Sequence, residues 1–420
     1  MLHAGTRCSR VVGSQPFVAC KAGAQHIGCS LGSKPFFGVD TLAYSGRRVL
    51  HRQLRSATVT MAKVDDPSQA FHSGQAKARS ALDEMSSTGE FKRTDSTYRD
   101  HIKKGTRFEP EAGRYHLYIA YACPWASRCL AVRNLKGLQD AIGLSVTHST
   151  WQRTKPDTDD EHCGWAFAGP EDPPLHSSTG YGEFSTEGCI PDNVNGAKFV
   201  RDLYEKVDDN AGKYTVPVLW DKKENTIVSN ESSEIMRMFN SEFNDIAKTP
   251  DLDLYPKDLW SVIEEVNSWV YPTINNGVYR CGFATTQKAY DTAFGELCAS
   301  LDRAEEILGK QRFIAGSRFT EADLRLFVTL IRFDEVYAVY FKTNRRLIRE
   351  YPNLKNYTAE IYQMPGIADS VNMQHIKMHY YTSHPKLNYY AVIPKGLEGT
   401  DAEWWKKPHN RDSHLGSVDV

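Results

Sequence analysis

The chain has 420 residues, of which 40% are hydrophobic and 25% charged, so it is long enough for about two or three ordinary globular domains. Its formal net charge of −1 gives no electrostatic reason to expect a nucleic-acid or membrane partner. No apolar run reaches the length of a bilayer span, which argues against an integral membrane protein.

The 9 cysteines are odd in number and widely scattered, which does not suggest a disulfide framework. None lies in C-x-x-C spacing, and the pair His162 and Cys163 has no matching pair nearby. The sequence therefore predicts no metal site.

Residues 1–62 differ in composition from the rest, because many Arg, Lys and Ser residues accompany a single acid, Asp40. Such an acid-poor leader is typical of an organelle transit peptide, and a disordered basic tail is the alternative. We expect a plastid rather than a mitochondrion, since the first twenty residues lack a clear amphipathic basic helix. Met61 could start an untargeted form that stays in the cytoplasm.

The first regular elements are predicted from residue 115 onward. Apolar residues alternate over 115–121, which predicts a half-buried strand. Cys123 and Pro124 follow, and helical spacing continues to Leu135. A second β-rich run over 144–150 then completes a βαβ unit with parallel strands.

Residues 151–196 are rich in Gly, Pro, Asp and Ser and predict a long inserted loop. A helical stripe over 197–208 comes next, followed by apolar runs at 216–221 and 226–228 that predict a hairpin. Pro217 cannot donate to a ladder, so it marks an edge or a break in strand pairing.

Capping residues and acids at 229–234 predict the start of a further helix. After a polar connector at 241–258, helical spacing continues to about residue 369. Thr320 and Asp323 predict a capping box there. The tail after Asn388 has no periodicity.

Cys123 is a candidate nucleophile. A thiol attacks as the thiolate, and the N–H groups at a helix start lower a thiol pKa. Pro124 fits the first helical position, which places Cys123 at such a start. The alternative is that Cys123 is a small buried hydrophobic residue.

Glu231 and Ser232 are a second candidate site. The hydroxyl, the carboxylate and the free N–H groups at a helix start could bind the α-carboxylate and α-amino groups of a γ-glutamyl moiety. Helix capping, which stabilises by about 1 kcal/mol, is the alternative. The backbone groups freed beside Val216 and Pro217 could pair with an extended peptide.

Five motifs resemble, in the same order, those of the Xi-class glutathione transferases, the glutathionyl-hydroquinone reductases, and the resemblance runs from about residue 70 to residue 410. They are Cys123-Pro124-Trp125-Ala126-Ser127-Arg128, Val216-Pro217-Val218-Leu219-Trp220-Asp221, Ser229-Asn230-Glu231-Ser232-Ser233-Glu234-Ile235, Asn275-Asn276-Gly277-Val278-Tyr279 and Tyr362-Gln363-Met364-Pro365-Gly366-Ile367-Ala368.

The resemblance implies an α/β thioredoxin-like N-terminal domain followed by an all-α C-terminal domain, and usually a homodimer. The thioredoxin-like domain would span 63–245, with an N-terminal extension and the inserted loop. The helical domain would span 256–388 and the C-terminal tail 389–420.

The resemblance also assigns roles to residues, with glutathione as co-substrate and no metal. Cys123 would be the catalytic thiol. Trp165, the Val216 backbone before a cis-Pro217, Glu231 and Ser232 would hold glutathione. Tyr279 and Tyr380 would face the aromatic substrate, with Arg280 and His379 nearby. Tyr380 lies in the aromatic run 379–381, which could equally belong to the core, and Cys163 stands where the family usually has Asn.

The implied reaction is a two-step thiol exchange, in which Cys123 takes the glutathionyl group from a glutathionyl-hydroquinone and a second glutathione removes it. An omega-like or glutaredoxin-like deglutathionylase shares this nucleophile and is the main alternative. A non-enzymatic interaction protein with the same fold is the other.

Overall fold

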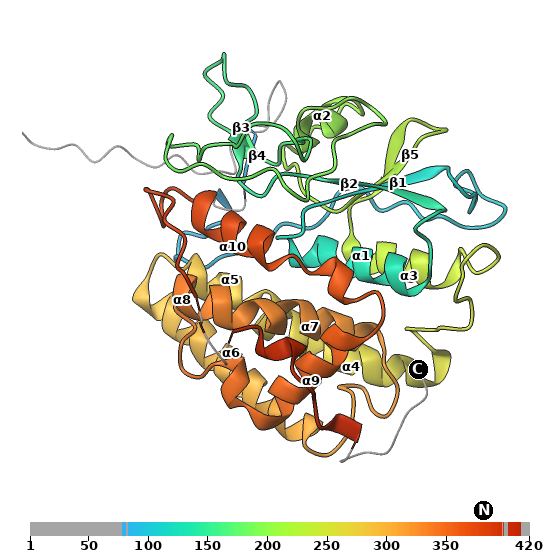
Figure 1. Ribbon diagram of the computed structural model, residues 1–420, viewed down its shortest axis with the longest axis vertical. Coiled ribbons are helices and arrows are strands. Elements are labelled where there is room, and N and C mark those ends of the chain that lie inside the picture. The colour runs from blue at the N-terminus through green and yellow to red at the C-terminus, as the bar shows by residue number, and fades with distance from the viewer. Residues whose placement is uncertain (1–77, 81–82, 397, 399–401, 413–420) are drawn as a thin grey trace, which may run out of the picture. The chain divides into compact units, whose positions relative to one another are not determined.

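A computed structural model describes residues 78–80, 83–396, 398 and 402–412 (Figure 1). The predicted leader, residues 1–62, lies outside the described residues, and so does the end of the C-terminal tail.

A four-stranded sheet forms the first layer. Its order is β2-β1-β5-β6, with β1 at Tyr115–Ile119, β2 at Ile142–Val146, β5 at Val218–Asp221 and β6 at Thr226–Ser229. β1 pairs parallel to β2 and antiparallel to β5, and β5 pairs antiparallel to β6. The predicted βαβ unit and the predicted hairpin are therefore confirmed. The prediction of a half-buried first strand is wrong, because every residue of β1 is buried between the helices and the inserted loop, and β2 ends at Val146 and not at residue 150.

Two helices, α1 at Pro124–Leu135 and α3 at Ser232–Ser241, pack against each other under the sheet (Figure 1). α2, at Val200–Glu205, is shorter than the helix predicted over 197–208. The Asp202 carboxylate accepts the N–H groups of Lys198 and Phe199, both at 2.9 Å, so the residues before α2 form a capping turn instead of a helical turn.

The inserted loop, residues 151–196, contains one small antiparallel pair, β3 at Gln152–Arg153 and β4 at Cys163–Gly164. It is tied to the main sheet by two backbone hydrogen bonds between Val146 and Ile190, of 2.9 and 3.0 Å. These bonds extend the edge of the sheet beyond β2 and hold the loop against the domain.

The second layer is helical. Its helices are α4 at Trp260–Val270, α5 at Gly277–Gly282, α6 at Gln287–Leu308, α7 at Glu321–Arg332, α8 at Ala338–Tyr340, α9 at Pro352–Gln363 and α10 at Met373–Thr382. π-helical turns cover Tyr271–Asn275 and Phe333–Tyr337, and 3-10 turns cover Lys257–Leu259, Ile348–Glu350, Ala368–Ser370 and Trp404–Lys406. Regular structure thus continues past the predicted limit near residue 369.

The predicted capping box at the start of α7 is present. The Asp323 carboxylate accepts the Thr320 N–H at 2.8 Å and the Thr320 hydroxyl at 2.9 Å. It also accepts the Tyr357 hydroxyl of α9 at 2.8 Å, so this buried acid joins two helices of the layer.

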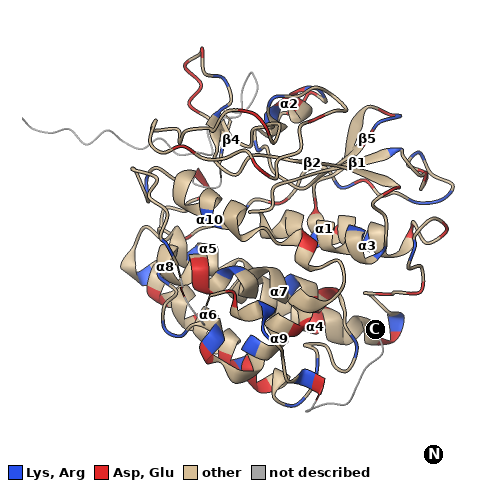
Figure 2. Cartoon of the chain, viewed as in Figure 1, with Lys and Arg blue, Asp and Glu red and all other residues tan. Residues whose placement is uncertain are grey.

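Charges of both signs are interspersed along α6 and α9 (Figure 2). No helix in the described part of the chain is both long and apolar enough to cross a membrane.

Candidate active site

A cavity of about 420 Å³ opens between the sheet domain and the helical layer. Eight of the nine site residues predicted from the sequence line it, namely Cys123, Trp165, Val216, Glu231, Ser232, Tyr279, His379 and Tyr380. Residues more than 250 positions apart in the sequence therefore meet in one place.

Cys123 is the N-cap residue of α1, and its extended backbone (φ −76°, ψ 115°) ends the loop that follows β1. Its thiol donates to the carbonyl oxygen of Val216 at 3.4 Å, and the Val216-Pro217 peptide bond is cis. The buried Arg332 of α7 fixes the loop from the other side, because its guanidinium donates to the carbonyls of Tyr121 and Ala122.

The pKa of the Cys123 thiol is raised by burial. The backbone N–H groups of Ala126 and Trp125 and the guanidinium groups of Arg332 and Arg93 lower it, but they do not outweigh burial. The expectation that the helix start gives this thiol a lowered pKa is therefore wrong, because burial outweighs the effect of the N–H groups and the guanidinium groups.

A pH dependence follows from this raised pKa. Only the thiolate is alkylated, and a group with a raised pKa releases its proton at higher pH. We expect the alkylation rate of Cys123 by iodoacetamide to keep rising above the pH at which an exposed thiol, with a pKa of about 8.5, approaches its plateau. Peptide mass spectrometry with N-acetylcysteine in the same tube measures both rates, and a midpoint for Cys123 at or below that of N-acetylcysteine would contradict the expectation.

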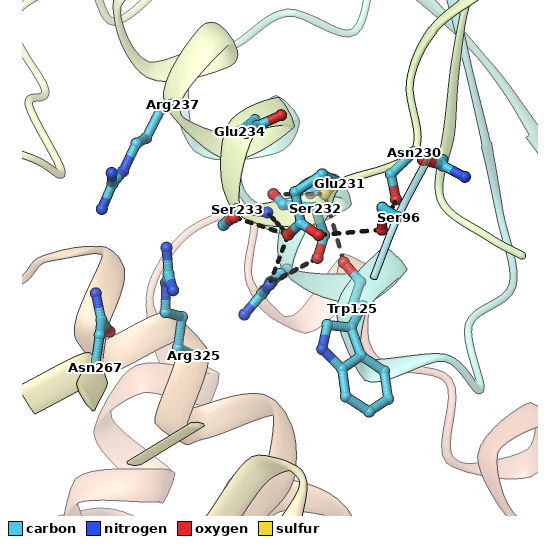
Figure 3. Close-up of polar contacts among 12 residues, drawn as sticks. Ser96, Trp125, Asn230, Glu231, Ser232, Ser233, Glu234, Arg237, Asn267 and Arg325 are labelled. Carbon is cyan, nitrogen blue, oxygen red and sulfur yellow. Dashed lines mark hydrogen bonds and ion pairs between the residues drawn. The ribbon is translucent and has the colours of Figure 1, made fainter. Parts of the chain in front are cut away.

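Glu231 is the N-cap residue of α3. Its carboxylate accepts the Ser233 N–H at 3.0 Å, the Ser233 hydroxyl at 2.7 Å and the Ser96 hydroxyl at 3.1 Å (Figure 3). Burial raises the pKa of Glu231, but these hydrogen bonds and the charge of Arg128 hold it below its usual value. Glu231 is thus ionised at neutral pH, and the predicted capping role is confirmed without excluding a binding role.

Ser232, at the first turn of α3, accepts two hydrogen bonds from the buried Arg128, at 2.7 Å from Nη2 and 3.2 Å from Nε. A second buried arginine, Arg325 of α7, also lines the cavity and donates to Glu321 at 2.9 Å. The end of the cavity at α3 thus combines an ionised carboxylate, a hydroxyl and two guanidinium groups, which suits the opposite charges of an amino acid.

The other end of the cavity is aromatic. The hydroxyls of Tyr279 and Tyr380 lie 2.5 Å apart, and the Tyr337 hydroxyl lies 3.0 Å from that of Tyr380. The Trp165 ring stacks on the His379 ring, with centroids 4.5 Å apart. Tyr380 is fully buried and also lines the cavity, so it belongs both to the core and to the site.

His379 is neutral, since burial lowers its pKa to about 4. Its Nδ1 lies 2.9 Å from the carbonyl oxygen of Ser149, and because a carbonyl only accepts, Nδ1 carries the proton. The Nε2 atom is therefore an acceptor.

Arg280 is the one predicted site residue that the structure places elsewhere. Its side chain donates to Glu296 at 2.5 Å and does not line the cavity. Arg280 follows Tyr279 in the helix α5, where adjacent side chains point in different directions, so a neighbour in sequence is not a neighbour in the site.

Several residues of the cavity region were not predicted from the sequence, among them Arg93, Ser96, Arg128, Arg325 and Tyr337. Arg128 carries the only local signal, since it lies five positions after Cys123 in the same helix. Among the described residues, no group of His, Cys, Asp and Glu could hold a metal ion.

An α/β domain with a cis-proline beside the start of its first helix, followed by a helical domain, is the architecture of a glutathione transferase. The family models agree, since the glutathione S-transferase N-terminal domain matches residues 122–242 and the C-terminal domain matches residues 287–360.

The chain belongs to the Xi class of this superfamily, the glutathionyl-hydroquinone reductases. It is 42% identical over 346 residues to the glutathionyl-hydroquinone reductase YqjG of Escherichia coli. The aligned region covers 80% of this chain and 96% of the relative. The crystal structure of the glutathione S-transferase Xi from Phanerochaete chrysosporium is similar, with a TM-score of 0.68, 44% identity, and coverage of 76% of this chain and 100% of that chain. The glutathione-bound structure of YqjG has a TM-score of 0.66 and 41% identity, and covers 76% of this chain and 97% of that chain.

Proposed function

We propose that the protein reduces glutathionyl-hydroquinones to hydroquinones, with glutathione as co-substrate. The observation that carries the proposal is that Cys123 lines one cavity together with the charged residues around Glu231 and the aromatic residues around Tyr279. A glutathionyl-hydroquinone has the matching order of an amino acid, a sulfur atom and an aromatic ring.

In the first step, the Cys123 thiolate attacks the sulfur of the conjugate. A disulfide bond forms between Cys123 and glutathione, the bond from sulfur to the ring carbon breaks, and the electron pair passes to the ring, which takes up a proton. In the second step, a glutathione thiolate attacks this mixed disulfide, which restores the Cys123 thiolate and releases oxidised glutathione.

This cycle requires no second cysteine of the protein, because the second glutathione resolves the mixed disulfide. Cys129, in the same helix, is fully buried, and its thiol contacts the carbonyl oxygens of Trp125 and Ser232, both at 3.4 Å. Burial raises the pKa of Cys129. It is therefore a packing residue and does not serve as a resolving thiol.

Turnover of a glutathionyl-hydroquinone by the purified protein, compared with turnover of a glutathionylated peptide, tests the proposal. We expect the aryl conjugate to be the better substrate, because the cavity wall beyond Cys123 is aromatic. Preference for the peptide would favour a deglutathionylase, and turnover of neither would favour a non-enzymatic role.

We also propose, on the resemblance to the family, that the protein is a homodimer. Sedimentation equilibrium of the purified protein tests this, and a mass near the 47.5 kDa of one chain would contradict it.

For localisation, we propose that residues 1–62 direct the protein to a plastid, on their acid-poor composition alone. A fluorescent protein fused after residue 62 should enter that organelle. Entry into mitochondria would support the alternative destination, and a cytosolic fusion would contradict targeting by this segment.

A further inference from the structure

The segment before the first strand forms one wall of the cavity. The backbone of Arg79 pairs with Gly212 at 2.7 Å, and the Tyr98 N–H donates to the Asn230 side chain at 3.1 Å. Between these points, residues 93–97 line the cavity. The segment is therefore held at both ends across the opening between α3 and α5.

Arg93 of this segment is enclosed by aromatic rings. Its guanidinium carbon lies 4.0 Å from the ring centroid of Trp125, 5.1 Å from that of Tyr279 and 5.2 Å from that of Phe91. Its Nε donates to the Asn276 side chain at 3.1 Å, three residues before Tyr279. Four contacts thus fix the guanidinium at the aromatic end of the cavity.

Within the described part of the chain, no carboxylate forms an ion pair with Arg93, and no hydrogen bond uses its two terminal nitrogens. The neighbouring cation, Lys213, is by contrast paired with Glu84 and with the carbonyl oxygen of Thr94. Arg93 is half-buried, so its charge is partly removed from water without a compensating anion. A fixed, partly desolvated guanidinium of this kind is suited to an anionic ligand.

We propose that Arg93 contacts the aromatic part of the substrate and stabilises the negative charge that reaches the quinol ring when its bond to sulfur breaks. For the charge to reach a ring oxygen, a proton first moves from a phenol oxygen to the ring carbon that bears sulfur, which gives the keto form of the conjugate. When the bond to sulfur then breaks, its electron pair restores the aromatic ring and leaves the negative charge on that oxygen as a phenolate, which takes up a proton. The guanidinium stands beside Tyr279, where that ring would lie. This inference rests on the proposed function.

Apart from the ring, the negative charges of the substrate are the two carboxylates of glutathione. The charged end of the cavity already provides Arg128, Ser232 and the N-terminus of α3 for the γ-glutamyl end. Arg93 lies among rings instead, which favours the aromatic part of the substrate. If Arg93 instead bound a carboxylate of glutathione, its replacement would weaken the binding of glutathione itself. The test below distinguishes these two roles.

The test compares Arg93→Gln, which removes the charge, with Arg93→Lys, which keeps it. Arg107→Gln is the matched control, because Arg107 is an exposed arginine of the same segment whose partner, Glu224, does not line the cavity. We expect Arg93→Gln to lower kcat/KM for a glutathionyl-hydroquinone by about ten- to a hundredfold, the effect of one charged hydrogen bond. Arg93→Lys should restore part of the loss, and Arg107→Gln should match the wild type.

A glutathionylated peptide separates charge stabilisation from a structural role. Its reaction with Cys123 releases a thiolate and places no charge on a ring, so Arg93→Gln should change its kcat/KM by less than about threefold. An equal loss with both substrates, or a weakened affinity for glutathione alone, would overturn the proposal.

A binding measurement does not require turnover. 4-Nitrophenolate is an ionised phenol whose absorbance reports its environment, and we expect it to bind Arg93→Gln at least about tenfold more weakly than the wild type. Equal affinity would overturn the role of Arg93 even if the wild type is an active reductase. If the wild type binds the phenolate through Arg93 but does not release hydroquinone, the proposed function fails and the anion site stands.

Discussion

Replacing Cys123 by serine should abolish the release of hydroquinone and leave the fold intact. A serine hydroxyl is essentially un-ionised at neutral pH and cannot form the mixed disulfide, so we expect activity to fall by at least about a thousandfold. A hydroxyl can still donate to the Val216 carbonyl oxygen that accepts the thiol, so the melting temperature should change little. Steady-state assays and thermal denaturation measure the two effects.

The matched control is Cys163→Ser. Cys163 is also half-buried and also lines the cavity, but it lies in β4 and not at the start of α1. This variant should keep its activity. Retention of more than a few per cent of activity in Cys123→Ser would contradict the mechanism.

Mass spectrometry of the wild type after incubation with oxidised glutathione should show one adduct, on Cys123. Cys129 and Cys281 are buried and do not line the cavity, whereas Cys123 is half-buried and does, so only Cys123 is open to oxidised glutathione among these three. An adduct mainly on either of these residues would show that the nucleophile is wrongly assigned.

Replacing Glu231 by alanine should weaken the binding of glutathione and its conjugates by about ten- to a hundredfold. The expectation follows from a charge-assisted hydrogen bond to the α-amino group, which contributes roughly 1.5–3 kcal/mol. Because Cys123 is untouched, the bound complex should react at a similar maximal rate, and most of the loss should appear in KM. Isothermal titration with glutathione measures the affinity directly.

Glu231 also caps α3, so the variant should lower the melting temperature as well. Glu234→Ala is the control. Glu234 lies in the first turn of the same helix, pairs with Arg99 and does not line the cavity (Figure 3). Glu234→Ala should lower the melting temperature and leave the affinity for glutathione unchanged. The same result in Glu231→Ala would remove Glu231 from the binding site.

The sequence predicted the elements that depend on local signals. The strand before Cys123, the hairpin after Pro217 and the helix start at Glu231 each follow from alternation, turn residues or capping within about ten positions. Their packing then brings Cys123, Val216 and Ser232 together, which only the resemblance to a family had implied.

The features that were not predicted depend on tertiary contacts. Tyr337 joins the tyrosine cluster because a π-helical turn follows α7, and Arg128 reaches Ser232 because α1 packs on α3. The pKa of Cys123 depends on how completely the cavity walls exclude water. No pattern within one segment of sequence carries that information.

The wall contributed by residues 79–98 means that the catalytic unit is larger than the two domains that the family models match. The two matched domains begin at residue 122, yet Ser96 donates to Glu231 and Arg93 stacks on Trp125 from outside them. A fragment that begins just before β1 would keep the sheet, the nucleophile and the helical layer, but the cavity would open to water on the side of α3 and α5. Grafting this site onto another transferase scaffold therefore requires the preceding segment as well as the two domains.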